Sequence, residues 1–236
     1  GVSSAASDVY KRQGEDALVL VLADGMGGYT GGELASRAAV EGCSRAFERK
    51  SGLPGERMKA AVTAANEQVW SARKKRGEDD EMGTTLVAAW IGADGLRWVS
   101  VGDSLLLLIR EGKMFLLNEL HQYSAELERM ADEGIISREE ALSHPARHSL
   151  TSALMGKEVP LVDLREECFP LFPGARVLVA SDGVGPYLDS LGPAGMRYLS
   201  MLSAEELVRS VLDGINRDGA PNQDNATLIC AEIARA

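Results

Sequence analysis

An unbroken apolar run near the start of the chain sets the first constraint on the fold. Residues 17–23 read ALVLVLA, and Asp24 and Gly25 follow directly. A strand with one face in water would alternate apolar and polar residues, so this run predicts a strand that is buried on both faces. Such a strand needs a covering layer on each side, and the chain must therefore fold in layers.

The rest of the chain is organised as blocks of helices around short strands. Helical patterns cover residues 32–50, 56–76, 124–144 (a pair of helices) and 204–213. Strands are predicted at 84–91, 97–101, 105–110, 113–117, 177–180 and 227–233. Gly95 and Gly112 lie where hairpin turns are expected. This grouping favours an α+β layered fold over a doubly wound sheet.

The first residues do not resemble the start of a domain. Residues 3–13 read SSAASDVYKRQ, which can be encoded in frame by DNA that resembles the adapter used in transposase-based sequencing libraries. We interpret residues 1–13 as a non-native leader and residues 14–236 as a single domain. The alternatives are a short disordered leader or a poor signal peptide, although the segment lacks the apolar stretch that a signal peptide needs.

Charge and composition exclude several classes of function. The net charge of −10 and the pI near 4.9 disfavour binding to nucleic acid or to an anionic membrane surface. No apolar run is long enough to predict a membrane-spanning helix. The chain has three cysteines, which are far apart in the sequence, and we expect free, buried thiols in a reducing cytoplasm.

Three aspartates share one local context. Asp24, Asp182 and Asp224 each follow or precede a predicted strand, with Gly or Asn as the next residue. Carboxylates gathered at strand ends repel one another unless a hard cation such as Mg²⁺ or Mn²⁺ lies between them. Each Asp-Gly taken alone is more often a turn, but the repetition of the pattern favours a metal site.

The glycines after Asp24 fit neither of the common phosphate-binding loops. The segment lacks the GK[ST] ending of a P-loop, and its glycine spacing does not match the dinucleotide fingerprint. Together with later motifs it resembles the metal-dependent serine/threonine phosphatases, the PPM family of bacterial 2C type. The motifs, in the family's order, are DGMGG (24–28), GGELAS (31–36), MGTT (82–85), VGDS (101–104), SDG (181–183) and QDNAT (223–227).

The resemblance implies a β-sandwich flanked by helices, with two Mn²⁺ or Mg²⁺ ions in its active site. By this resemblance, Asp24 bridges the two ions, Gly25 offers its carbonyl, and Asp182 and Asp224 complete the site. Asp103, in what we take to be a VGDS hairpin, helps to hold a third, weaker ion or merely caps a turn. The resemblance also implies that a metal-bridged water hydrolyses the phosphate ester.

Several residues depart from the family pattern. Members carry a phosphate-clamping Arg and an acidic metal contact upstream of DGMGG, but here Arg12 lies in the suspect leader and Asp16 is too close to Asp24. We therefore expect the N-terminal strand or strands of the fold to be missing, and the substrate-binding residues stay unknown. Tyr29 replaces a common His, and Leu105 replaces a common Arg.

His121 and the polar helical pair allow two interpretations each. His121 is either a general acid or, more in keeping with its context, a partly exposed structural residue. His144 and His148 receive no role. Residues 124–147 are either the family's mobile flap or a plain surface hairpin.

The resemblance therefore predicts an enzyme that removes phosphate from serine and threonine in proteins. It would act in a bacterial cytoplasm against a Ser/Thr kinase, with phosphorylated proteins as partners and without nucleic acid or membrane. One alternative is a catalytically impaired module of the same fold that binds or senses partners. Another is a phosphatase that acts on an anti-sigma antagonist.

Overall fold

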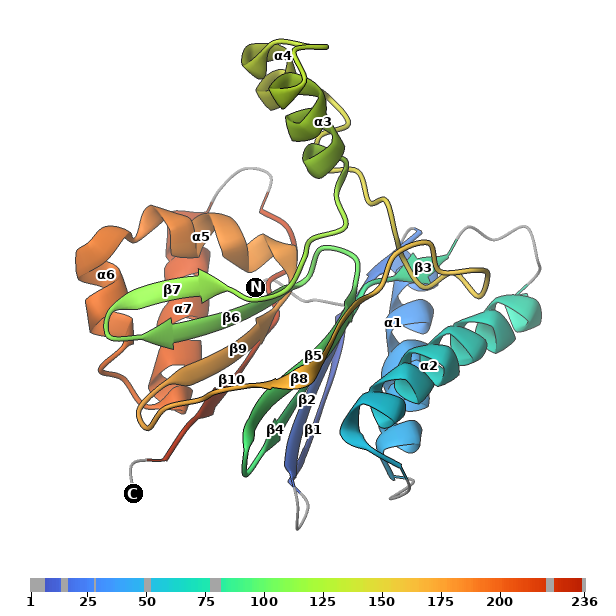
Figure 1. Ribbon diagram of the computed structural model, residues 1–236, viewed down its shortest axis with the longest axis horizontal. Helices are drawn as coiled ribbons and strands as arrows, with labels where there is room; N and C mark the ends of the chain where they lie inside the picture. The colour runs from blue at the N-terminus through green and yellow to red at the C-terminus, as the bar shows by residue number, and fades with distance from the viewer. Residues whose placement is uncertain are drawn as a thin grey trace.

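Two antiparallel sheets lie face to face between two layers of helices (Figure 1). The computed structural model describes residues 7–13, 17–27, 29–48, 52–76, 82–219 and 223–234. The first sheet has the order β1-β2-β4-β5-β8, with β3 paired to β2; the second has the order β10-β9-β6-β7. The first comprises β1 (Ser7–Gln13), β2 (Ala17–Met26), β3 (Gly83–Thr84), β4 (Leu86–Gly92), β5 (Gly95–Val101) and β8 (Asp163–Phe169). The second comprises β6 (Leu105–Arg110), β7 (Lys113–Leu116), β9 (Arg176–Ala180) and β10 (Leu228–Glu232).

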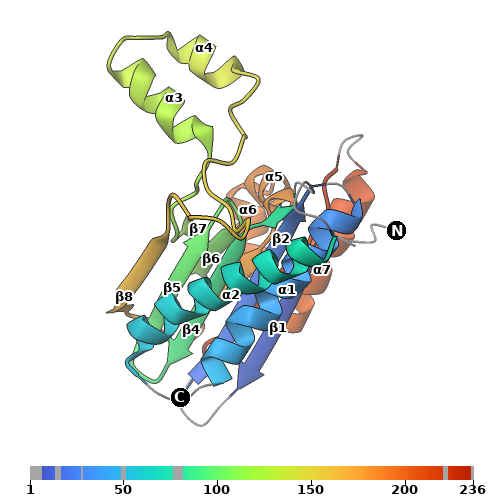
Figure 2. The same cartoon turned by 90° about the vertical axis from the view of Figure 1, so that its right-hand side faces the viewer.

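The predicted two-sided burial of the first apolar run is confirmed. In β2, Val19 and Val21 face the helices α1 (Tyr29–Glu48) and α2 (Pro54–Arg76), which lie together across the first sheet (Figure 2). Leu20 and Leu22 face the other way and pack against the second sheet. A third core lies between the second sheet and α5 (Gly185–Ser190), α6 (Gly192–Leu199) and α7 (Ala204–Asp218).

Most predicted elements are present, and the α+β sandwich is confirmed. Gly95 and Gly112 both close hairpins, with positive φ angles of 137° and 72°. The VGDS segment, however, is not a hairpin turn. β5 pairs with β4 and β8, whereas β6 pairs with β7 and β9, so VGDS carries the chain from the first sheet to the second. The sequence analysis also missed β8, α5 and α6.

Residues that we interpreted as a leader form a strand. β1 pairs with β2 along its whole length, from Ser7 opposite Asp24 to Gln13 opposite Leu18. A strand therefore borders β2 where we expected the N-terminal strand to be missing. Residues 1–6 and 14–16 lie outside the described part of the chain, and the foreign origin of residues 1–13 stays a prediction.

The polar helical pair stands apart from the layers as a hairpin (Figure 1). It consists of α3 (Tyr123–Asp132) and α4 (Arg138–Ser143), and Gly134 interrupts it with a φ of 72°. A capping box begins α4: Ser137 Oγ accepts from the Glu140 amide at 3.1 Å, and the Glu140 carboxylate accepts from the Ser137 amide at 2.8 Å. We call α3 and α4 with their connection the flap.

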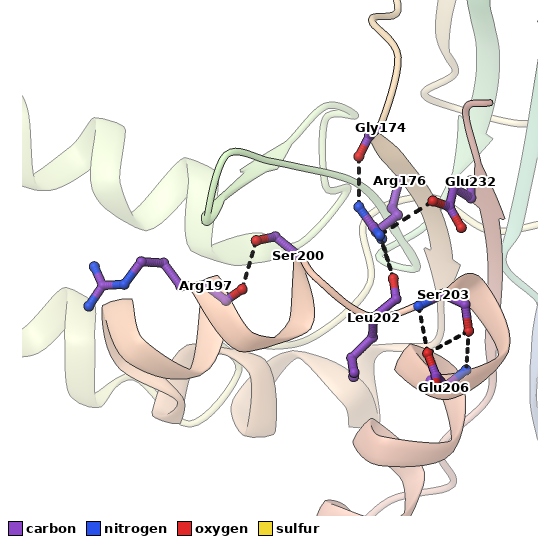
Figure 3. Close-up of polar contacts among 8 residues, drawn as sticks. All are labelled: Gly174, Arg176, Arg197, Ser200, Leu202, Ser203, Glu206 and Glu232. Carbon is purple, nitrogen blue, oxygen red and sulfur yellow. Dashed lines mark hydrogen bonds and ion pairs between the residues drawn. The ribbon is translucent and has the colours of Figure 1, made fainter. Parts of the chain in front are cut away.

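A buried arginine joins the second sheet to its helices (Figure 3). Arg176 on β9 is 4% exposed, and its guanidinium donates to the carbonyls of Leu202, at 2.8 Å, and Gly174, at 2.7 Å. Glu232 on β10 lies 3.4 Å from the same group. Two half-buried residues, Gly174 and Leu202, thus have their carbonyls bound by one side chain, which fixes the entry to α7.

Two further expectations concern the cysteines and the membrane. All three cysteines are free; Cys43 and Cys230 are buried as expected, but Cys168 is only half-buried. Along the described residues, no helix combines the length and the apolar character needed to cross a bilayer.

Candidate active site

The aspartates singled out in the sequence lie where the strands of both sheets end. Asp24 is in the last part of β2, and Asp182 follows β9 directly. The register of the second sheet aligns Leu105 with Ala180 and Ala180 with Leu228, so the segments bearing Asp103, Asp182 and Asp224 meet at one end. The fold thus brings together residues that lie as much as two hundred positions apart in the sequence.

The threonines of the MGTT motif hold the backbone of Asp24. Thr85 Oγ1 accepts from the Asp24 amide at 3.0 Å, and the Asp24 carbonyl accepts from the Thr85 amide at 2.9 Å and from Thr84 Oγ1 at 2.9 Å. Thr85 Oγ1 also lies 2.7 Å from Ser104 Oγ, which belongs to the VGDS segment. These bonds connect the ends of the two sheets and fix the position of Asp24 relative to Asp103.

The SDG and QDNAT motifs interlock in the same way. Ser181 Oγ donates to the Asn225 carbonyl at 3.0 Å and accepts from the Thr227 amide at 3.0 Å. Gln223 Nε2 donates to the Gly183 carbonyl at 3.0 Å. A Cβ on Gly183 would stand 2.5 Å from the Asn225 oxygen, so only glycine permits this approach.

Glycine is also required where α1 meets the first motif. A Cβ on Gly32 would stand 2.7 Å from the carbonyl oxygen of Gly25. The GGELAS segment therefore lets the first turns of α1 pack directly on the DGMGG loop. The role of Gly25 as a carbonyl ligand stays a prediction.

The carboxylates influence one another electrostatically. The pKa of Asp24 is raised to about 7, first by burial and then by repulsion from Asp182, Asp224 and Asp103. The pKa of Asp182 is raised to about 6, first by burial and then by Asp103 and Asp224. Burial likewise raises the pKa of Asp103, against a hydrogen bond from Gln122 that lowers it. The site therefore concentrates negative charge in a poorly solvated place.

This donor set fits a hard divalent cation in its chemistry. Oxygen ligands with several negative charges are what Mg²⁺ and Mn²⁺ prefer. In the described part of the chain, however, no three His, Cys, Asp or Glu side chains converge into a ready-made metal cluster. Binding a cation would thus require the carboxylates to draw closer together, and the ligand roles of Asp24, Asp103, Asp182 and Asp224 stay predictions.

The structure distinguishes the two histidines nearest these acids. His121 is 5% exposed, and its Nδ1 accepts from the Gly102 amide at 3.0 Å, with a pKa lowered mainly by burial. It is therefore a buried structural residue, although we had expected partial exposure. His148, to which we assigned no role, is exposed and close enough for its charge to lower the pKa of Asp103 and of Asp182.

The positions that depart from the family pattern are described only in part. Leu105 is 9% exposed and packs in the core beneath α5 to α7, so it makes no polar contact of the kind an Arg would offer. The side chains of Arg12 and Tyr29 lie outside the described residues, as does Asp16.

Comparison with known proteins agrees with the motifs. The family model of protein phosphatase 2C matches residues 5–215. The serine/threonine protein phosphatase PstP of Mycobacterium tuberculosis is 32% identical over 222 residues, which are 92% of this chain and 40% of that protein. The serine/threonine phosphatase stp of Listeria welshimeri is 31% identical over 171 residues, 70% of this chain and 66% of that protein. The chain thus spans less than two thirds of the length of either relative.

A solved structure extends this similarity to the fold. The catalytic domain of PstP in complex with two manganese ions superposes with a TM-score of 0.73 and 28% identity, covering 98% of this chain and 92% of that domain.

Proposed function

The chain belongs to the protein phosphatase 2C family, and from that premise we propose that it hydrolyses phosphoserine and phosphothreonine in proteins with Mn²⁺ or Mg²⁺. The observation that carries this proposal is the meeting of Asp24, Asp103, Asp182 and Asp224 at one end of both sheets, where burial and the neighbouring carboxylates raise the pKa of Asp24, Asp103 and Asp182. Such clusters of perturbed acids mark functional sites more often than structural ones.

The residues suited to hold the ions are those that the sequence singled out. Asp24 and the Gly25 carbonyl, with Asp182 and Asp224, would hold two ions, and Asp103 would help to hold a third. Divalent ions at such a site supply Lewis acidity, which activates water and neutralises charge on the phosphoryl group. The manganese ions of the PstP structure support this choice of metal.

The protein's own contribution is to position the acids in advance. Thr84 and Thr85 bind the main chain of Asp24 from both sides, and Ser181 ties the loop of Asp182 to that of Asp224. These bonds hold the main chain at the strand ends, so that only the carboxylate side chains have to move when the site binds an ion. Burial of the same groups strengthens every charge interaction made there.

The substrates and their setting follow from the same proposal. The partners would be proteins phosphorylated by a Ser/Thr kinase, and the enzyme would counter that kinase in signalling in the cytoplasm. The names of the relatives, which are serine/threonine phosphatases, support this substrate class.

The test is Mn²⁺-dependent hydrolysis of p-nitrophenyl phosphate and of a phosphothreonine peptide. We expect wild-type protein to hydrolyse both and Asp182→Asn to lose at least 100-fold in rate, on the order of what removal of a key electrostatic group costs. Asp189→Asn, an exposed acid on α5, is the matched control and should retain activity. Equal rates in wild type and Asp182→Asn would refute the proposed site. A folded wild type without any Mn²⁺-dependent activity would favour the binding module instead.

A further inference from the structure

The flap joins the body of the protein through a short two-stranded stalk, residues 117–122 and 149–154. The Tyr123 amide donates to the Ser149 carbonyl at 2.9 Å, and the Thr151 amide donates to the His121 carbonyl at 2.9 Å. Gln122 and Leu150 form an antiparallel bridge between the same two segments. The base of the flap is therefore ordered by paired backbone hydrogen bonds.

This stalk is bound directly to the VGDS segment. The His121 amide donates to the Gly102 carbonyl at 2.9 Å, and the Gly102 amide donates to His121 Nδ1 at 3.0 Å. One residue further along each segment, Gln122 Nε2 donates to Asp103 Oδ2 at 2.8 Å. Three successive contacts thus link the root of the flap to a residue of the acidic cluster.

The side chain of Gln122 forms its hydrogen bond with Asp103 and not with the first turn of α3. Gln122 is the N-cap residue of α3, where a side chain usually accepts a hydrogen bond from the first turn. Its side chain makes no such bond. The Gln122 amide instead donates to the carboxylate of Asp103, a residue that is 7% exposed.

We propose that Gln122 is a positioning residue that orients Asp103 for a cation. This inference rests on the proposed function, because it assumes that Asp103 meets a divalent ion. Groups that hydrogen-bond a metal ligand fix its orientation and tune the affinity of the site.

The test uses the full chain with Gln122→Met, which has nearly the same shape but no donor. Gln68→Met, on α2 at the groove between α1 and α2, is the matched control for the same chemical change. Mn²⁺ binding is measured by calorimetry. We expect Gln122→Met to weaken the weakest Mn²⁺-binding step by about tenfold.

The outcomes separate this inference from the proposed function. Mn²⁺ titrations of Gln122→Met that superimpose on those of wild type would overturn the role of Gln122 while leaving the proposed function intact. A wild type that binds no Mn²⁺ and hydrolyses no phosphate ester would overturn both. In an Asp103→Asn background, Gln122→Met should have no further effect on Mn²⁺ affinity, and an undiminished effect there would show that Gln122 acts through another group.

Discussion

Replacing Asp24 by Asn should stabilise the metal-free protein at neutral pH. The pKa of this half-buried carboxyl rises from 3.8 to about 7 on folding, first through burial and then through repulsion from Asp182, Asp224 and Asp103. A raised pKa in the folded state favours folding at low pH, and the gain is lost as pH rises from 3.8 through 7. At pH 7.5 the ionised Asp24 therefore opposes folding.

The size of the effect follows from that shift. A change of about three pKa units corresponds to about 4 kcal/mol if the carboxylate were fully shielded from water. Water reaches this half-buried group and screens its charge, which reduces the gain from removing it to about 1–2 kcal/mol. For a domain of this size, that corresponds to a rise in Tm of about 2–8 °C.

The assay is thermal unfolding in EDTA between pH 4.5 and pH 8, followed by circular dichroism. Asp24→Asn should melt above wild type at pH 7.5, and the gap should close toward pH 4.5, where the wild-type carboxyl is protonated. Mn²⁺ should reverse the order by stabilising wild type more than the variant. Asp213→Asn, an exposed acid on α7, is the control and should show little change at either pH.

Two results would refute this reasoning. An Asp24→Asn protein that is less stable than wild type in EDTA at pH 7.5 would mean that the carboxylate makes favourable contacts outweighing its repulsion. A stabilisation of the same size at pH 4.5 and pH 7.5 would mean that the gain comes from the amide and not from the lost charge.

Two further substitutions test the scaffold. Thr85→Val keeps the shape of a buried side chain but leaves the Asp24 amide and Ser104 Oγ without this partner, so we expect a loss of about 1–3 kcal/mol in urea unfolding and slower Mn²⁺-dependent hydrolysis. Arg176→Leu removes the donor to the carbonyls of Gly174 and Leu202, so we expect a loss of about 2–4 kcal/mol in the same assay, with the rate per folded molecule unchanged. A Thr85→Val protein with full activity, or an Arg176→Leu protein as stable as wild type, would contradict these roles.

Local pattern was enough to predict the elements whose burial is regular. The run that forms β2 is apolar at every position because helices cover one face and the second sheet covers the other. β8 has no such pattern. Its sequence, DLREECF, lies at the edge of the first sheet with much of each side chain in solvent, so nothing in its composition distinguished it from a loop.

Glycine and proline obscure α5 and α6 in the sequence. Gly185-Pro186 and Gly192-Pro193 have the composition of turns, and no element was predicted there. In the structure both prolines are in the first turn of a helix, where the missing amide hydrogen costs nothing and the fixed φ suits the helix.

The crossing at VGDS depends on partners that the sequence does not reveal locally. Gly102 has a φ of 97°, as a hairpin glycine would, and a Cβ there would stand 2.8 Å from Thr85 Cβ. β5 and β6 could have paired with each other as a hairpin, or each with strands that are distant in the sequence. The choice depends on the pairing of all the strands in both sheets. The same limit explains why the contact of Gln122 with Asp103 was missed, since it forms between the flap and the body.

The acidic cluster predicted from sequence thus comes with a cost that the sequence did not show. If ionised Asp24 opposes folding by about 1–2 kcal/mol, the network of Thr85, Ser104 and Ser181 must hold the site open against it when no cation is bound. A cation present at a hundred times its dissociation constant would contribute about 2.7 kcal/mol to stability. That gain exceeds the repulsion, so on our proposal the metal-bound form is the more stable one and the empty site is maintained by the scaffold alone. A site of this kind favours ligand binding over stability, and the substitutions that stabilise it without metal should be those that remove its function.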